Sequence, residues 1–269
     1  RWNCDWSSDV CSSDLVVDDE DFSRFAVERL LTKRNAQIIS AIDGATAIKA
    51  MIEAVTEGKQ IEAVITDLNM LPVNGLELLK SIRVGFPGIP RTMPVIMFTA
   101  LQGFDLVGSA MALDVNAFIP KPVSKNELYT ALEDAKYEPP EFQEAADYRR
   151  IPTPGSDDLD NIVRKLGLDG AITPLKEEEP VTPEVTKPVE DGQTEEEEIK
   201  TEEEVGIGPV SMGRILSRDY TSPSGKIILG CDTKLSKNMI NRMKDLRRID
   251  PDLPQMLWVR IEQPAESKS

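Results

Sequence analysis

The chain has 269 residues, which is enough for one or two domains that each have a core of their own. Its formal net charge of −16 argues against a protein built mainly to bind nucleic acid or an anionic membrane surface. Histidine is absent, so this sequence cannot supply the reactive histidine of a kinase or phosphotransfer module, or the histidine metal ligands of a phosphodiesterase.

Residues 1–14 fit none of the patterns that follow. They show no apolar stretch typical of a signal peptide and no helical or strand periodicity. The stretch from Asp5 to Leu15 resembles the translation of a sequencing adapter, so we expect residues 1–14 to be a non-native tail; a disordered native tail is the alternative. Without them one cysteine remains, Cys231, and a lone thiol favours the reducing cytoplasm.

Short apolar runs alternate with amphipathic stretches over the next part of the chain. The expected strands are 15–18, 37–41, 63–66, 95–98 and 117–119, and the expected helices are 21–33, 44–55, 75–83, 104–113 and 124–136. The fourth helix has a weaker pattern and an internal glycine, Gly108. Alternation of strands and helices implies right-handed crossovers, so residues 15–137 are expected to form an α/β domain with a parallel sheet.

Polar residues stand at the ends of four of these apolar runs. They are Asp18 and Asp19 in the first, Asp67 in the second, Thr99 in the third and Lys121 in the fourth. Ligands of open α/β sheets bind beyond the carboxyl ends of the strands, so these groups should converge on one edge. Close carboxylates repel one another unless a cation lies among them, and oxygen ligands suit Mg²⁺. The chemistry that fits is transfer of a phosphoryl group onto a carboxylate.

Five motifs occur in a characteristic order. They are VVDDE at 16–20, ITDLNM at 65–70, Asn74-Gly75, MFTA at 97–100 and FIPKP at 118–122. In order and spacing they resemble the receiver domain of two-component response regulators, of the chemotaxis type, over about residues 15–137. The resemblance implies a doubly wound, flavodoxin-like sheet of order 2-1-3-4-5. It also implies a cytoplasmic signalling protein that catalyses only its own phosphorylation.

The resemblance implies partners as well. A histidine kinase or phosphotransfer protein would donate the phosphoryl group. A downstream protein target would contact the face formed by the fourth helix, fifth strand and fifth helix. Neither nucleic acid nor a membrane is expected as a partner.

The resemblance also assigns the acidic residues their roles. Asp67 is expected to be the phosphoacceptor. Asp19 and Asp67 are expected to bind Mg²⁺ directly, while Asp18 orients waters and the backbone carbonyl of Asn69 completes the shell.

Three further residues receive roles from the same resemblance. Lys121 is expected to reach a phosphoryl oxygen, and a cis peptide before Pro122 would hold it in place. The hydroxyl of Thr99 is expected to bind the phosphoryl group. Phe118 is expected to act as an aromatic switch that follows Thr99, with a plain core residue as the alternative.

Residues 138–208 differ sharply in composition from the segment before them. Proline recurs, and between residues 177 and 204 thirteen aspartates and glutamates stand against two lysines. Such a segment buries too little apolar surface to offset the entropy lost on ordering. We therefore expect a disordered, self-repelling acidic linker.

Residues 209–262 are expected to form a small β-rich module with one helix, followed by a tail at 263–269. Strands are expected at 210–219, 226–229 and 257–261, and Ser236 is expected to cap the helix. The stretch from residue 212 to residue 246 resembles the small module that accompanies phosphodiesterase-type response regulators. We expect this module to stay separate from the preceding domain in the unphosphorylated state, apart from weak docking of its basic helix at 236–248.

Two other functions remain open. The first is transcriptional regulation by DNA binding, because residues 209–249 contain nine lysines and arginines against three aspartates. Against it, this segment has one aromatic residue, Tyr220, and no evident recognition helix. The second is a phosphatase with an aspartate nucleophile, which needs a second acid two residues further on, where this chain has Asn69.

Overall fold

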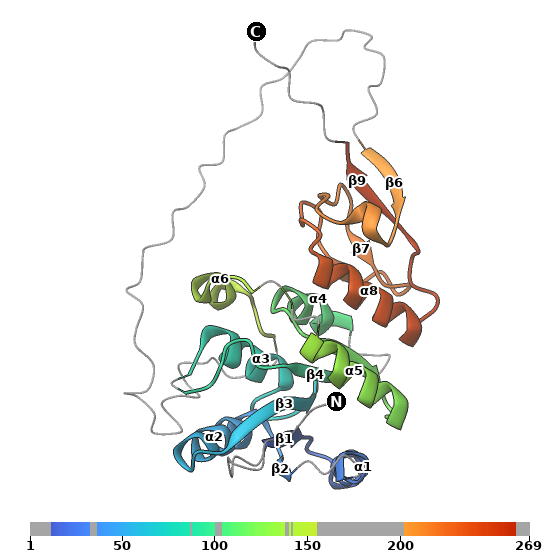
Figure 1. Cartoon of the computed structure of the whole chain (residues 1–269). Helices are drawn as coiled ribbons and strands as arrows, with labels where there is room; N and C mark the ends of the chain where they lie inside the picture. The colour runs from blue at the N-terminus through green and yellow to red at the C-terminus, as the bar shows by residue number, and fades with distance from the viewer. Residues whose placement is uncertain are drawn as a thin grey trace, which may run out of the picture.

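The computed structural model describes residues 12–32, 37–86, 88–99, 104–137, 140, 142–154 and 202–261. A five-stranded parallel sheet lies at the centre of the first part, and its order β2-β1-β3-β4-β5 confirms the expected fold class (Figure 1). Its strands are β1 (Ser12–Val17), β2 (Gln37–Ala41), β3 (Gln60–Asp67), β4 (Val95–Thr99) and β5 (Ala117–Pro120). Within the described ranges, no helix is both long and apolar enough to cross a membrane.

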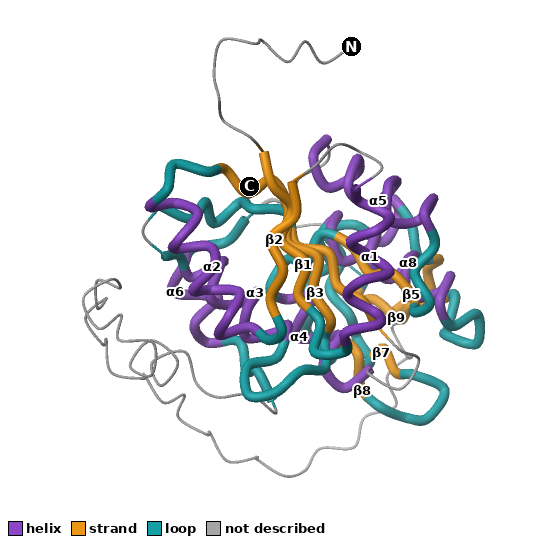
Figure 2. Tube along the Cα trace, turned by 90° about the horizontal axis from the view of Figure 1, so that it is seen from below, coloured by secondary structure: helices purple, strands orange, loops and turns teal. Residues whose placement is uncertain are grey.

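Helices cover both faces of this sheet. They are α1 (Asp21–Thr32), α2 (Gly44–Thr56), α3 (Gly75–Val84), α4 (Phe104–Ala112) and α5 (Lys125–Tyr137). Figure 2 shows α1 and α5 on one side of the sheet and α2 and α3 on the other. Successive residues of β1 serve the two cores, because Val16 packs with α1 and α5 whereas Val17 packs with α2, α3 and α4. Burial of both faces explains why the strands are continuous apolar runs.

Strand β1 begins three residues earlier than expected. Ser13 and Asp14 lie in register with β2 and β3, and their exposed fractions are 1% and 6%. The strand therefore extends into the expected tail, whose non-native origin stays a prediction. The backbone hydrogen bonds of a strand do not depend on its side chains, so these polar residues complete the sheet despite lacking an apolar pattern. The buried hydroxyl of Ser13 has no hydrogen-bond partner in the described part of the chain.

Replacing Ser13 by valine is expected to raise the free energy of unfolding by about 1 kcal/mol. The change removes an unpaired buried hydroxyl and adds a β-branched side chain to a central strand. Urea denaturation of the full chain measures the effect. Ser40→Val in the neighbouring strand is the control, because the Ser40 hydroxyl is exposed and donates to Glu28. Destabilisation by Ser13→Val would contradict the expectation.

Residues 142–154, here called the strap, are ordered although they fall within the expected linker. The strap contains α6 (Ala145–Arg150), and its Tyr148 is fully buried. The Tyr148 hydroxyl donates to Asp114 Oδ2 over 2.7 Å, and Asn74 Nδ2 donates to the carbonyl oxygen of Pro154 over 3.1 Å. One buried aromatic anchor thus orders a segment whose average composition is that of a linker. Residues 155–201 of the expected linker lie outside the described residues.

Residues 202–261 form the C-terminal module, which begins seven residues earlier than expected. Its elements are β6 (Glu202–Gly206), η1 (Pro209–Ser211), β7 (Tyr220–Thr221), β8 (Ile227–Leu229), α8 (Lys237–Ile249) and β9 (Met256–Arg260). The acidic strand β6 pairs antiparallel with β9, which is why it belongs to the module. The expected strand at 210–219 is wrong, since this stretch contains a 3-10 turn and isolated bridges. The expected cap is confirmed: Ser236 accepts from the Met239 amide.

The module packs against the first domain instead of standing apart from it. Its α8 lies beside α4 (Figure 1), and α8 and β8 lie against β5 and α4. The buried apolar residues of the module form one continuous core with those of α4. The expectation of a module joined only by weak docking of its helix is therefore wrong. Apolar side chains of α8 and β8 that would otherwise face water are covered by this contact.

Candidate functional site

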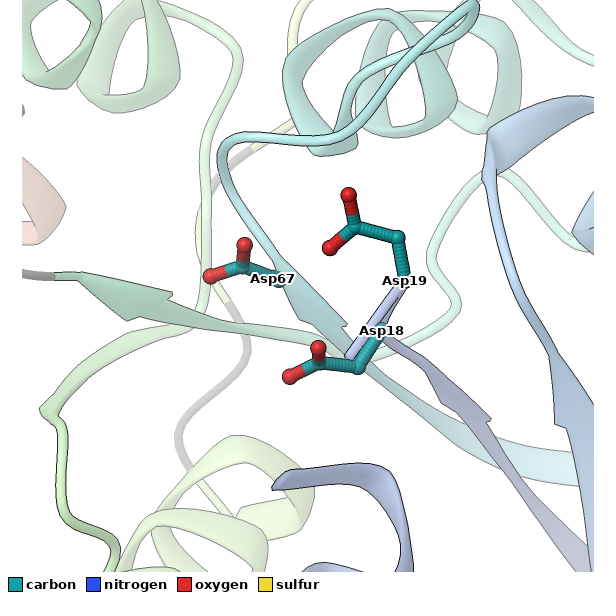
Figure 3. A group of neighbouring side chains, drawn as sticks. All are labelled: Asp18, Asp19 and Asp67. Carbon is teal, nitrogen blue, oxygen red and sulfur yellow. The ribbon is translucent and has the colours of Figure 1, made fainter. Parts of the chain in front are cut away.

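The acidic side chains meet at the carboxyl edge of the sheet, as expected. Asp18 and Asp19 follow β1, and Asp67 is the last residue of β3. Oxygen atoms of these three carboxylates lie within 4.8 Å of one another, and Figure 3 shows the side chains gathered beyond the strand ends. Such a group of oxygen donors can hold a hard divalent cation.

Lys121 joins this cluster from the end of β5. Its ammonium Nζ lies 2.9 Å from Asp67 Oδ1 and 3.0 Å from Asp18 Oδ2. Partial burial lowers the pKa of Lys121, but its contacts with Asp67 and Asp18 outweigh burial and leave that pKa above the ordinary value. Lys121 is therefore a firmly protonated ammonium, and the Lys121–Pro122 peptide is cis.

The pKa of Asp67 is raised above its ordinary value. Burial is the largest cause, the charge of Asp18 adds to it, and Lys121 acts in the opposite direction. The folded chain therefore favours the protonated form of Asp67 more than the unfolded chain does.

Asp18 differs from Asp19 and Asp67 in the number of hydrogen bonds that its carboxylate accepts. It is completely buried, and it accepts hydrogen bonds from the Glu20 amide (2.9 Å), the Ser23 hydroxyl (2.7 Å) and Lys121. Asp19, in contrast, is exposed. The carboxylate most open to a cation is therefore Asp19, whereas Asp18 is held by its donors and the buried Asp67 is paired with Lys121.

The loop after Asp67 is held close to β3 by two residues of the predicted motif. Asn74 caps α3 by accepting from the Glu77 amide over 2.9 Å. A Cβ atom on Gly75 would lie 2.1 Å from the carbonyl oxygen of Asp67, so only glycine allows this approach. The bond from Asn74 to the strap was not foreseen, because no local pattern in the strap indicates it.

The remaining candidates lie around this centre. Thr99 ends β4 opposite Pro120, but its side chain lies outside the described part of the structure. Phe118 is 5% exposed and belongs to the core beneath α4. This burial agrees with the alternative that Phe118 is simply a core residue. Asn69 is exposed in the loop after Asp67. The switch role of Phe118 and the metal-ligand role of Asn69 stay predictions.

Comparison with known proteins agrees with this geometry. Residues 15–133 match the family model described as the response regulator receiver domain. Over 121 residues the chain is 34% identical to a chemotaxis protein CheY homolog of Campylobacter jejuni, a match that covers 45% of this chain and 88% of that protein. The chain belongs to the response regulator receiver family. The family match ends before the strap and the module.

Two further matches cover a similar share of this chain. The chain is 31% identical over 120 residues to the sensory/regulatory protein RpfC of Xanthomonas campestris, covering 45% of this chain and 16% of that protein. The matched part thus spans less than a fifth of that relative. A crystal structure of a receiver domain protein from Clostridium thermocellum is 26% identical, with a TM-score of 0.41 and coverage of 46% of this chain and 93% of that one.

Proposed function

We propose that this protein receives a phosphoryl group on Asp67 from a histidine kinase or phosphotransfer protein, with Mg²⁺ bound beside it, and signals by protein contact. The observation that carries the proposal is the meeting of Asp67 with Lys121 and the open carboxylate of Asp19 at one sheet edge. DNA binding through the module is not favoured, because Asn238 and Arg242 of α8 contact the receiver domain.

The reaction is a displacement at phosphorus. A carboxylate oxygen of Asp67 attacks the phosphoryl group, the bond from phosphorus to the donor's imidazole nitrogen breaks, and the freed imidazole regains its neutral form by taking up a proton. Lys121 lies within reach of the transferred oxygens and offers a compact positive charge. Asp19 and Asp67 would hold Mg²⁺, which supplies neutralisation of the charge on those oxygens when it is bound.

Labelling of the full chain tests this proposal. With Mg²⁺ and acetyl phosphate, the chain is expected to gain one phosphoryl group, with release of acetate, and peptide mass spectrometry should locate it on Asp67. Chelation of Mg²⁺ should suppress the reaction. A phosphoryl group found mainly on another residue would contradict the proposal.

Replacing Lys121 by methionine is expected to slow this labelling about 100-fold, since the loss of one charged donor to a transition state costs roughly that factor. The pH dependence should change as well. Attack requires the ionised carboxylate, so labelling is lost as the pH falls through the pKa of Asp67. Without Lys121 that pKa rises further, and the loss should begin at a higher pH.

The matched control for this variant is Lys125→Met, four residues further along the chain. Lys125 is exposed and lies over the ring of Tyr129, away from the carboxylates. Initial labelling rates of both variants across a pH series test whether the Lys121 ammonium contributes to the transfer. A Lys121 variant that labels as fast as the Lys125 variant would show that the ammonium has no part in the transfer.

A further inference from the structure

The module and the receiver domain together line a cavity of about 440 Å³. Helix α8 contributes most of the lining, and Asp134 of α5 and Asn116, the residue directly before β5, belong to it as well. A volume of this size is ordinary for a pocket that takes a small molecule. No residue of the acidic cluster at Asp67 is among the described residues that line the cavity, so it is distinct from the phosphoacceptor site.

The cavity carries an excess of positive charge. Four cationic side chains and two carboxylates line it, namely Lys237, Arg242, Lys244, Arg248, Asp134 and Asp245. This local excess of two positive charges stands in a chain whose formal net charge is −16. Asp245 is already paired with Arg242 at 3.0 Å and with Arg248 at 3.5 Å. A concave surface with this charge favours a ligand that carries about two negative charges.

Arg242 brings a buried donor to the cavity that the described part of the chain does not use. The residue is 8% exposed, and its guanidinium donates to the carbonyl oxygen of Asn116. Its Nε is buried too, but it has no hydrogen-bond partner among the described residues. A buried N–H without an acceptor destabilises the fold, so an acceptor atom from a ligand in the cavity would stabilise this arrangement.

The neutral groups of the cavity suit hydroxyl groups better than an aromatic ring. Asn238 and Asn241 of α8 both line it, and a side-chain amide can donate to one hydroxyl group and accept from another. None of the described lining residues is aromatic, so nothing among them is suited to stack on a nucleotide base. The lining therefore favours an anion that is attached to a hydroxylated body.

We propose that the cavity between α5 and α8 binds a phosphate monoester of a small hydroxylated molecule, such as a phosphorylated sugar. Its phosphate group, which carries close to two negative charges at neutral pH, lies against the cations of α8. Its hydroxyl groups bond to the amides of Asn238 and Asn241. The ligand lies between the receiver domain and the module. The inference does not depend on the proposed role of Asp67.

Isothermal titration calorimetry of the full chain tests this proposal. The probes are glucose-6-phosphate, ribose-5-phosphate and glycerol-3-phosphate, in a buffer with EDTA so that no Mg²⁺ supports phosphate binding beside Asp67. At least one of these esters should bind with a Kd below about 1 mM. Inorganic phosphate should bind more weakly than that ester, because it leaves the amides unused, and glucose should not bind.

Three variants place the ligand in the cavity. Lys244→Gln removes an exposed cation of α8 and should weaken binding of the best ester about tenfold, since a charge-assisted hydrogen bond is lost. Asp134→Asn removes a like charge from α5 and should strengthen binding about threefold. Asn241→Leu should weaken binding of the ester but not of inorganic phosphate. The matched control is Lys234→Gln, which removes an exposed lysine of the module outside the lining and should leave the affinity unchanged.

Several results would overturn the proposal. Failure of all three esters to bind is one of them. Equal weakening by Lys244→Gln and Lys234→Gln is another, because the ester would then respond only to the overall charge. An affinity that does not rise in Asp134→Asn would mean that the ligand does not lie between α5 and α8. Tighter binding of AMP than of all three esters would contradict the preference for a hydroxylated body.

Discussion

Replacing Asp67 by asparagine is expected to abolish phosphorylation and, at the same time, to stabilise the fold at neutral pH. An amide oxygen is too weak a nucleophile to form an acyl phosphate, so labelling by acetyl phosphate should be lost completely. The stability effect follows from the raised pKa of Asp67, which burial causes more than any other factor. A raised pKa means that the folded chain binds the proton of this group more tightly than the unfolded chain does.

The stabilising effect of Asp67→Asn depends on pH, because burial disfavours only the ionised form of Asp67. As the pH rises from below the ordinary pKa of aspartate to above the raised one, the ionised Asp67 progressively destabilises the folded state. Asparagine carries no charge at any pH, so the variant should be more stable than the parent at pH 7. The difference should shrink as the pH falls below the ordinary aspartate pKa, about 3.9. Urea denaturation at several pH values measures it.

The control for Asp67 is Glu20→Gln, which removes an exposed carboxylate from the same edge of the sheet. This change should leave both the labelling and the free energy of unfolding nearly unchanged. Undiminished labelling of the Asp67 variant would mean that another group accepts the phosphoryl group. A variant less stable than the parent at pH 7 would mean that the pairing with Lys121 outweighs the burial of Asp67.

The centre of the site could be predicted because each part of it is local. Asp18, Asp67 and Lys121 each follow a short apolar run, and the carboxyl ends of parallel strands necessarily meet at one edge. Which carboxylate stays open could not be predicted in this way. That distinction depends on Ser23 and the Glu20 amide, whose bonds to Asp18 follow from the position of α1.

Two ordered segments that the sequence analysis assigned to the linker, the strap and β6, depend on partners far away in the sequence. Tyr148 orders the strap by reaching Asp114, and the acidic strand β6 forms because β9 lies beside it. Neither segment has apolar residues at helical or strand spacing, so its composition alone predicts a linker. Gly108 also depends on a distant partner. In the sequence it only lowers the helix propensity of α4. In the structure it leaves room for β8, because a Cβ atom there would lie 2.1 Å from the carbonyl oxygen of Ile228.

Arg83 of α3 shows how much of the stability rests on one buried charge. It is 0% exposed, and burial lowers its pKa to about 10, so it remains charged at neutral pH. Its guanidinium donates to four acceptors: the carbonyl oxygens of Arg91, Met93 and Asp114, and Asn116 Oδ1. These bonds join α3 to the segments that precede β4 and β5.

Arg83→Met is expected to lower the free energy of unfolding by about 3 to 5 kcal/mol, because methionine fills much of the volume but leaves buried oxygens without donors. Arg83→Lys should recover little of this, since one ammonium cannot span acceptors placed for a planar fork. Arg150→Met is the control, as its side chain is 78% exposed and should change stability by less than about 0.5 kcal/mol. Urea denaturation of the full chains measures all three. A loss below about 1 kcal/mol for Arg83→Met would show that the acceptors find other donors and that α3 does not depend on this charge.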